Sequence, residues 1–432
     1  DLNLTDKLEA AGKVSVLAAP IRLCTRYARG DLVSWTEMNQ AVAKAVEAAP
    51  NDWIACHFYL EWRITVDGLY PDLNLDVKTI ETITENVYNN KDLEFFRAYL
   101  HRIDAARFVD EGKFKEALNL RNKALIIARK YDDQVMVSYL LNLIAQLLRH
   151  SDVTRAIELH LSAREMSERL GFRYNLGNIQ HQLAHIMGLR GETSAAIDHH
   201  IEYQNICASL GIPTVGMNAI IAFYYNQIGD GEKALELTTS TNENTASLLH
   251  KMPFNQLQVA YALINLGRLE EAKDALAVAH DLAIKSGVSN NLMYLRAVEG
   301  ILDKADQRYD AAIECFKEVL RFLEEDPIPL WLNICLLELT EIEIERLTDE
   351  SLDKESDSSG PWMKRLFEHV EKNDLPGVAA RALLLKAKLR NRQRRLDEAR
   401  EILREIKKKA ESPSMRYLND LAITMMPDLI VS

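Results

Sequence analysis

The sequence predicts an all-α protein built from repeated helix-turn-helix units. Its 432 residues include only 17 Gly and 11 Pro, while Ala, Leu, Glu and basic residues are frequent, a balance that favours helix over strand. The stretch from Leu266 to Ala272 has the pattern of a helix that ends at a Gly, a tight turn, and a second helix that opens with acidic residues. The same pattern recurs at nearly fixed spacing, which is typical of a repeat array.

The first ninety residues are predicted to be helical but irregular. Helix-period apolar positions run over residues 5–19, 35–49 and 76–88, and Asn51 or Asp52 can cap a further helix that runs to Val66. An array must cover the apolar face at its end. We therefore expect residues 1–90 to form an irregular N-terminal capping region.

From residue 91 onward, one alanine marks the start of each second helix. These anchor alanines follow one another at intervals of 39, 40, 38, 38, 40 and 87 residues. Because the last interval is about twice the others, one repeat is hidden within it, and we expect about eight regular repeats. The anchors are Ala117, Ala156, Ala196, Ala234, Ala272, Ala312 and Ala399.

A second small residue stands twelve positions before most anchors, in the first helix of the repeat. A small side chain at a helix crossing lets the two helices approach closely, because side-chain bulk sets the distance between their axes. A Gly five positions before four of the anchors supplies the left-handed turn that ends the first helix. The second small residues are Ala105, Ala184, Ala222, Ala260, Gly300 and Ala387, with Ile144 as the exception.

This pattern resembles the tetratricopeptide repeat, a helix-turn-helix unit that stacks into a right-handed superhelix. The resemblance covers roughly residues 91–412 and implies a right-handed α-solenoid. The period of 38 to 40 residues exceeds the 34 of the standard repeat, because the second helices are longer. The lengthened form is similar to the repeats of kinesin light chains, peptide-sensing bacterial regulators and the helical sensor domain of MalT-type transcription activators.

The hidden repeat is predicted between Ala312 and Ala399. A long first helix over 330–347 precedes an acidic, serine-rich loop at 349–360, and Pro361 starts the return helix at a position where proline is tolerated. Further helices are expected at about 375–392 and 396–410. A short helix from Ser414 to Met426, within the 413–432 segment, is expected to cap the C-terminal end.

Charge and cysteine usage exclude several classes of partner. The formal net charge of −12 argues against nucleic acid or anionic lipid as the partner of the whole surface. Five scattered cysteines without a Cys-x-x-Cys pair indicate neither a disulfide framework nor a zinc site, which fits a reduced, cytoplasmic setting. No apolar run approaches the roughly 20 residues of a membrane helix. We expect no membrane association and no nucleic-acid partner.

No catalytic motif is found in the sequence. It contains no phosphate-binding loop, no nucleophile elbow and no His-Glu-x-x-His helix, so we predict no enzyme activity, no catalytic residue and no cofactor. His181 and His185 share a helix face and precede His199 and His200, but this spacing supplies two converging ligands where zinc needs three or four. We therefore predict no metal site and interpret these histidines as exposed groove residues.

The resemblance implies that the first helices line a concave face. The inward positions lie 18, 15, 11, 8 and 7 residues before each anchor. The selected side chains are polar and aromatic, and they suit an extended peptide, because amides can pair with its backbone and Arg can hold a carboxylate. Polar positions on any surface helix give the same composition without a function. The predicted groove residues are Tyr99, Arg102, Asp110, Ser138, Arg149, Asn178, His181, His185, Phe223, Asn226, Gln227, Tyr261, Asn265, Tyr294 and Lys304.

The C-terminal part of the array is basic and the preceding part is acidic. Residues 381–410 hold 12 Lys or Arg against 4 Asp or Glu, and residues 324–358 hold 12 Asp or Glu against 2 Lys or Arg. We interpret the basic stretch as a solvated face that pairs with the acidic residues of the neighbouring repeat. Docking of an acidic partner segment is the alternative.

The sequence therefore predicts a non-catalytic scaffold or adaptor that binds a peptide or protein segment in its concave groove. The alternative is an effector-sensing regulatory domain of a larger signalling or transcription regulator, as the resemblance to MalT-type proteins implies. In that case the groove would bind a small effector.

Overall fold

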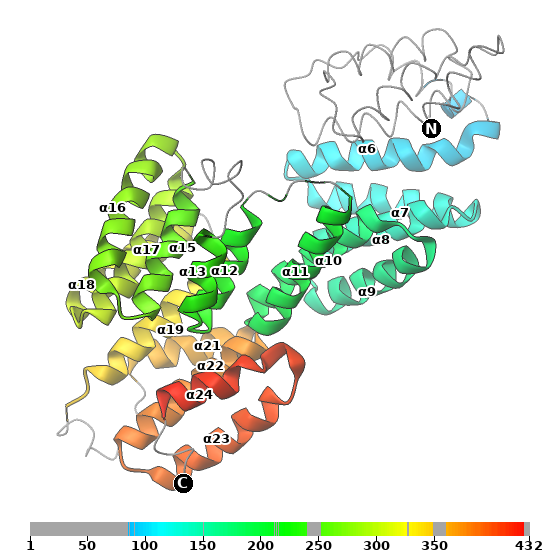
Figure 1. Ribbon diagram of the computed structural model, residues 1–432. Helices are drawn as coiled ribbons and strands as arrows, with labels where there is room; N and C mark the ends of the chain where they lie inside the picture. Colours follow the sequence, from blue (N-terminus) through cyan, green and yellow to red (C-terminus); the bar gives the residue numbers. More distant parts are fainter. Residues whose placement is uncertain are drawn as a thin grey trace. The chain divides into compact units, whose positions relative to one another are not determined.

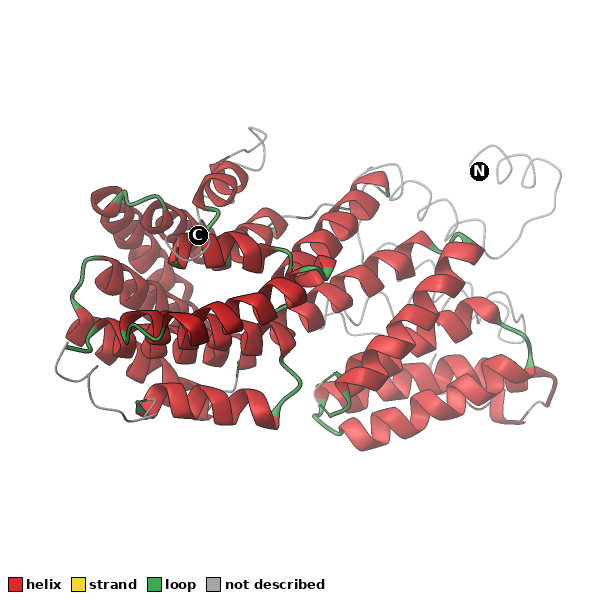
Figure 2. Cartoon of the chain, turned by 90° about the horizontal axis from the view of Figure 1, so that it is seen from below, coloured by secondary structure: helices red, strands yellow, loops and turns green. Residues whose placement is uncertain are grey.

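The computed structural model describes residues between 85 and 426, with gaps that include 211, 213, 215, 240–251, 326–327 and 349–359. All regular elements in this part of the chain are helices, and Figure 2 draws them with their connecting loops. The prediction of an all-α fold is confirmed. The predicted N-terminal capping region and the acidic loop lie outside the described residues, apart from a few positions at their edges.

The chain divides into two compact units, with boundaries at Ile179 and Gln180 and a short excursion at 209–211. Unit 1 contains a 3₁₀ helix at Lys91–Phe96 and the beginning of α10 (Arg173–Arg190). Its other described helices are α6 (Arg97–Asp110), α7 (Phe114–Lys130), α8 (Gln134–Leu148) and α9 (Val153–Leu170).

Unit 2 holds the end of α10 and all the later helices. They are α11 (Thr193–Ser209), α12 (Met217–Gln227), α13 (Gly231–Thr239), α15 (Pro253–Asn265), α16 (Leu269–Ser286), α17 (Ser289–Ala305), α18 (Tyr309–Glu325), α19 (Pro329–Glu345), α21 (Pro361–Lys372), α22 (Pro376–Arg392), α23 (Leu396–Ala410) and α24 (Tyr417–Met425). A 3₁₀ turn at Pro413–Met415 joins the last two helices.

Consecutive helices pack as pairs, and Figure 1 shows the helices of successive colours lying side by side within each unit. Each pair is one helix-turn-helix repeat, so the described residues form the predicted all-α array. The pairs are α6 with α7, α8 with α9, α10 with α11, α12 with α13, α15 with α16, α17 with α18, α19 with α21, and α22 with α23.

The predicted contact between small residues is present in every repeat. All seven anchor alanines have no exposed surface, and the alanines twelve positions earlier are equally buried. At Gly300 an added Cβ atom would lie 3.0 Å from Cζ of Phe316 and 3.1 Å from Cβ of Cys315. The two helices of this repeat therefore approach closely enough to exclude a larger side chain.

The turn inside each repeat needs a left-handed residue. Gly267 has φ +72° at this position, and Gln307 and Arg394 adopt φ 58° and 56° at the equivalent places in repeats without Gly. The turn geometry is thus a property of the repeat, and Gly is its least strained solution.

The hidden repeat has the predicted helices. Helix α19 and its return helix α21 flank residues 349–359, and Pro361 is the first residue of α21. Helices α22, α23 and α24 follow at the predicted places. Among the described helices, none is both long and apolar enough to cross a bilayer.

The burial of the anchor predicts a large effect of side-chain size at this position. Ala272→Leu places three extra carbon atoms at a fully buried crossing of α15 and α16, and overpacking of this kind costs about 1–3 kcal/mol. The midpoint of thermal unfolding should fall by several degrees. The matched control is Ala277→Leu, because Ala277 is exposed on the same helix. Equal midpoints for the two variants would contradict the packing rule.

Candidate functional site

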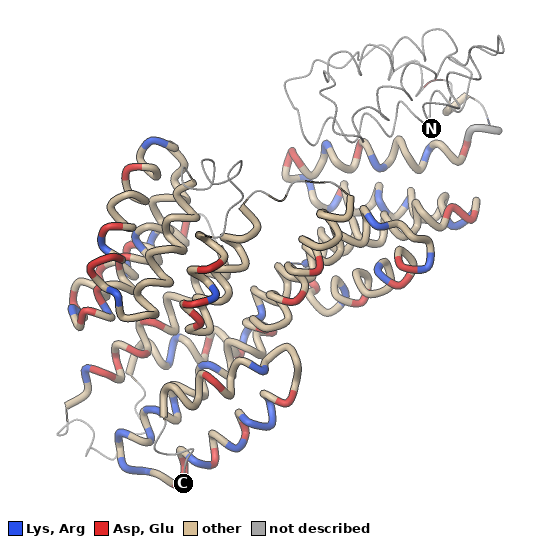
Figure 3. The backbone as a smooth tube through the Cα atoms, in the orientation of Figure 1, with Lys and Arg blue, Asp and Glu red and all other residues tan. Residues whose placement is uncertain are grey.

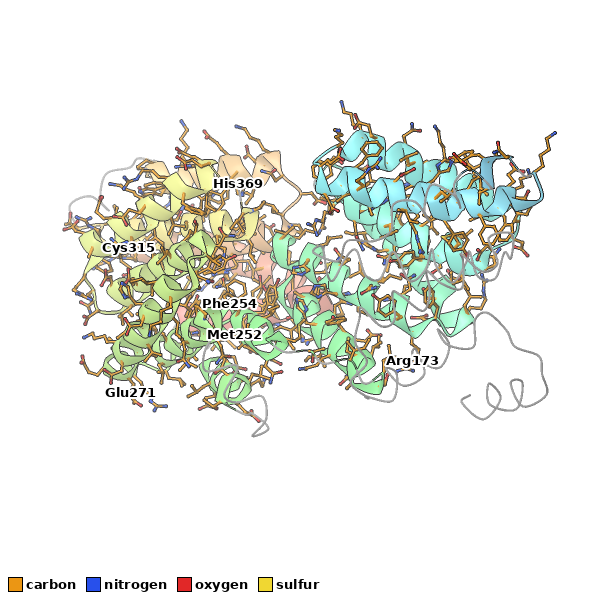
Figure 4. All side chains as sticks on the ribbon, turned by 90° about the horizontal axis from the view of Figure 1, so that it is seen from above. Arg173, Met252, Phe254, Glu271, Cys315 and His369 are labelled. Atoms are coloured by element: carbon orange, nitrogen blue, oxygen red, sulfur yellow. The ribbon has the colours of Figure 1, made fainter. Side chains whose placement is uncertain are left out.

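The first helices of unit 2 meet along one inner surface. At one end of this surface, four aromatic rings from α12, α15, α17 and α19 form a closed circle. Phe223 lies 6.2 Å from Phe254, Phe254 lies 5.7 Å from Tyr294, Tyr294 stacks on Trp331 at 5.2 Å, and Trp331 returns to Phe223 at 5.5 Å, measured between ring centroids. Such pairs stabilise a core beyond the area they bury. Figure 4 shows Phe254 among the helices of unit 2 and Glu271 at their outer edge.

The other end of the inner surface is polar. Gln227 donates from Nε2 to the Tyr261 hydroxyl at 3.3 Å and accepts from Arg381 at 3.5 Å. Lys304 bridges Glu338 and Glu341, with 2.6 Å between Nζ and Oε2 of Glu341. The first helices α12, α15, α17, α19 and α22 all contribute to this network.

Glu341 lies between two lysines on different helices. Lys388 is 2.8 Å from the Glu341 carboxylate, so α17 and α22 are both joined to α19 through one side chain. Burial alone would raise the pKa of Glu341, but Lys304 and Lys388 lower it to about 2. Burial alone would lower the pKa of Lys304, but Glu338 and Glu341 hold it above its ordinary value.

The interior of unit 2 is almost completely filled. A cavity of about 20 Å³ remains, with Tyr224, Gln227, Asn333 and Arg381 in its lining. This volume admits roughly one water molecule. The inner surface is therefore closed to a peptide in this conformation.

The structure brings together five of the predicted groove residues: Phe223, Gln227, Tyr261, Tyr294 and Lys304 all belong to the inner surface of unit 2. They contact one another and the neighbouring helices instead of lining an open groove. Two further predicted residues lie beside them, since Asn265 donates to the Asn226 carbonyl at 3.0 Å and Asn226 donates to the Gln258 carbonyl at 3.1 Å. As contacts to a bound peptide, these positions remain predictions.

Three of the predicted groove residues in unit 1 are buried. Tyr99 donates to Asp133 at 3.2 Å, and the guanidinium of Arg102 lies 4.8 Å from the centre of the Tyr139 ring. Ser138 is within 2.7 Å of the Ser167 hydroxyl and has no exposed surface. These contacts join adjacent repeats.

The remaining predicted residues of unit 1 lie closer to the surface: Asp110 is exposed, and Arg149 and Asn178 are partly buried. Nothing in their contacts identifies a bound segment, and their role as groove residues stays a prediction.

The histidines of α10 and α11 come together in unit 2. His181 and His185 are 3.1 Å apart through their Nε2 atoms, and both rings lie within 5.6 Å of the His200 ring centroid. His181 and His185 are half-buried, and His200 has no exposed surface. Within the part of the chain that the structure describes, no group of three or more His, Cys, Asp or Glu residues is arranged to hold a metal ion.

The basic stretch pairs with the preceding acidic repeat, as predicted. Lys388 contacts Glu341 and Glu345, and Arg392 lies 3.7 Å from Glu345 and donates to the Leu347 carbonyl at 3.0 Å. Figure 3 shows the basic residues gathered along α22 and α23. Part of the positive charge is thus used to join α22 to α19.

Several residues of the inner surface were missed by sequence reasoning. Phe254 stands 18 residues before Ala272, which is one of the inward positions, so the repeat pattern could have found it. Trp331, Glu338 and Glu341 belong to the repeat whose anchor is hidden, and Arg381 closes the network from α22. No pattern in the sequence singles out these four.

The described helices define an all-α array of tetratricopeptide-like repeats. Three solved structures are similar to it: a tetratricopeptide repeat protein from Parabacteroides merdae (14% identity, 76% of this chain and 99% of that chain, TM-score 0.34), yeast Tom70 (12%, 100% and 92%, 0.37) and the tetratricopeptide repeat domain of P58(IPK) (13%, 99% and 97%, 0.26). These likenesses concern the fold alone. No family model and no curated protein matches the sequence.

The position of Glu341 between two lysines predicts its effect on stability. Glu341→Gln should lower the free energy of unfolding by about 2 kcal/mol, because it removes a charged hydrogen-bonding partner of both lysines. The folded-state pKa of about 2 lies below the model value of 4.5, so this contribution is complete above pH 4.5 and is lost as the pH falls towards 2. The variant should therefore lose less stability than the natural chain over that interval.

The control for Glu341 is Glu314→Gln. Glu314 pairs with Lys317 on the exposed surface of α18, where an ion pair contributes about 0–1 kcal/mol. Chemical denaturation of both variants measures the difference. A loss at Glu341 no greater than that at Glu314 would show that the inner network adds nothing.

His200 predicts a second dependence of stability on pH. Burial, with contributions from His185, His181 and His199, lowers the pKa of His200 to about 3. The unfolded chain takes up a proton below about pH 6.5, whereas the folded chain does not, so stability falls from pH 6.5 towards 3. His200→Leu should reduce this fall, measured as the thermal midpoint at pH 7 and pH 5. His280→Leu is the exposed control, and an identical pH response of the two variants would contradict the assignment.

Proposed function

We propose that the chain is a non-catalytic protein-interaction scaffold and that unit 2 binds an amphipathic helix of a partner protein on its outer side. The observation that carries the proposal is an open furrow over α16, α17 and α18. Two adjoining cavities, of about 370 and 620 Å³, share His280, Arg296 and Glu299 in their linings. We call the two together the outer furrow.

The outer furrow has apolar ends and a charged middle. Leu292 and Phe322 line one end, and Leu276 and Val278 line the other. Leu292 and Val278 are 45% and 48% exposed, which is high for apolar side chains in one depression. In the middle, Arg296 is held by Glu318 and Glu299.

This arrangement suits a helix with apolar residues on one face. A groove between two surface helices receives such a face through anchors at helical spacing, and polar groups in the groove set its register. The outer furrow needs no rearrangement to be reached, whereas the filled interior leaves room for about one water molecule. The predicted peptide site on the inner surface is therefore a proposal for an opened form of unit 2.

Site-specific crosslinking tests the scaffold function. A benzoylphenylalanine residue at Leu292, expressed in cells of the native host, should crosslink to a partner protein, and Val278→Asp in the same chain should reduce the yield. The matched control is the same probe at Ile284, which is 57% exposed on α16 but does not line the outer furrow. Equal crosslinking at Leu292 and Ile284, or none at either, would contradict the proposal.

A further inference from the structure

The first and last helices of unit 2 touch each other along a narrow contact, which we call the seam. At its centre, the turn between α10 and α11 meets the first turn of α22. A Cβ atom added at Gly377 would lie 2.0 Å from the carbonyl oxygen of Gly191, so the two backbones are in direct contact. The hydroxyl of Tyr417, from α24, donates to the same carbonyl at 2.8 Å.

Polar side chains flank the seam on both sides. Arg416 holds Asp198 of α11 through two contacts of 2.8 and 2.9 Å, and Arg190 at the end of α10 pairs with Asp374. The side chain of Asn333, on α19, donates to the Leu189 carbonyl at 3.0 Å. These contacts join residues 144 to 218 positions apart in the chain.

The inner surface is closed by contacts that run in the same direction as the seam. Phe223 of α12 meets Trp331 of α19, and Gln227 of α12 meets Arg381 of α22. In each case an early first helix touches a late one. Movement of α19 and α22 away from α10 and α12 would therefore open the seam and the inner surface together.

The seam differs from the contacts between successive repeats. Successive repeats share a continuous apolar core from α12 to α19, whereas the seam consists largely of hydrogen bonds and surface ion pairs. Arg416 and Asp198 are 54% and 51% exposed, and exposed ion pairs contribute about 0–1 kcal/mol each and weaken in salt. A repeat array can also change pitch in small steps, because each repeat packs mainly on its neighbours.

We propose that the seam is a releasable latch that holds unit 2 in a self-occupied form. In the closed form, aromatic and charged side chains of the inner surface bind one another. When the latch opens, the same side chains become available to a partner segment. The identity of that segment rests on the scaffold function proposed above, whereas the latch itself does not.

Gly377→Ala is the sharpest test of the latch. The added methyl group meets backbone atoms of Gly191, so the seam must separate, while alanine favours helix α22 relative to glycine. Hydrogen–deuterium exchange of the full chain should show amides of α19 and α22 exchanging at least tenfold faster than in the natural chain. The circular dichroism of the helices should stay unchanged.

A charge exchange at the edge of the seam is the second, milder test. Asp198→Arg places two arginines opposite each other and should accelerate exchange in the same helices, and the double variant Asp198→Arg with Arg416→Asp should restore slow exchange. The matched control is Glu318→Arg, which disturbs an ion pair of the outer furrow and should leave α19 and α22 protected. Unchanged exchange in Gly377→Ala and Asp198→Arg, or failure of the double variant to restore it, would overturn the latch.

These outcomes separate the latch from the scaffold function. Faster exchange in the seam variants supports the latch even if no partner crosslinks at Leu292. A crosslink at Leu292 with unchanged exchange supports the scaffold and removes the latch.

Discussion

The close approach of two helices at a methyl-sized side chain is the constraint on which the rest of the structure depends. Each anchor alanine is fully buried against the first helix of its repeat, so the second helix lies at a fixed short distance from the first. Because the same distance recurs in every repeat, the first helices of unit 2 are held close enough for side chains from α12, α15, α17 and α19 to touch. The aromatic circle and the charged network both follow from this spacing.

The array as a whole could be predicted from the sequence because its signals are local. A buried alanine, a left-handed turn five residues earlier and a small partner twelve residues earlier recur at a fixed period, and even the repeat with a hidden anchor was found by its interval. The inward positions were also identified correctly as a set in unit 2, since Phe223, Tyr261, Tyr294 and Lys304 share one surface. Phe254 occupies an inward position and was accessible to the same rule.

Closure of the inner surface could not be predicted, because it depends on the sum of small rotations between repeats. A change of a few degrees at each crossing decides whether α22 passes α10 or meets it, and no single residue records that sum. Gly377 reads in the sequence as an ordinary glycine after Pro376, and its contact with Gly191 becomes visible only when the turn is complete. The same holds for Arg416 and Asp198, which are 218 residues apart.

The central claim is that unit 2 is closed on itself by a polar seam. The most direct measurement is the distance between spin labels at Ile201 of α11 and Ile423 of α24, two exposed positions on the helices that the seam joins. Unit 2 is expected to give one narrow distance distribution at low salt and a second, longer population in 1 M salt, where the ion pairs are screened. A broad distribution at low salt, or a distance that salt does not change, would contradict the closed and releasable form.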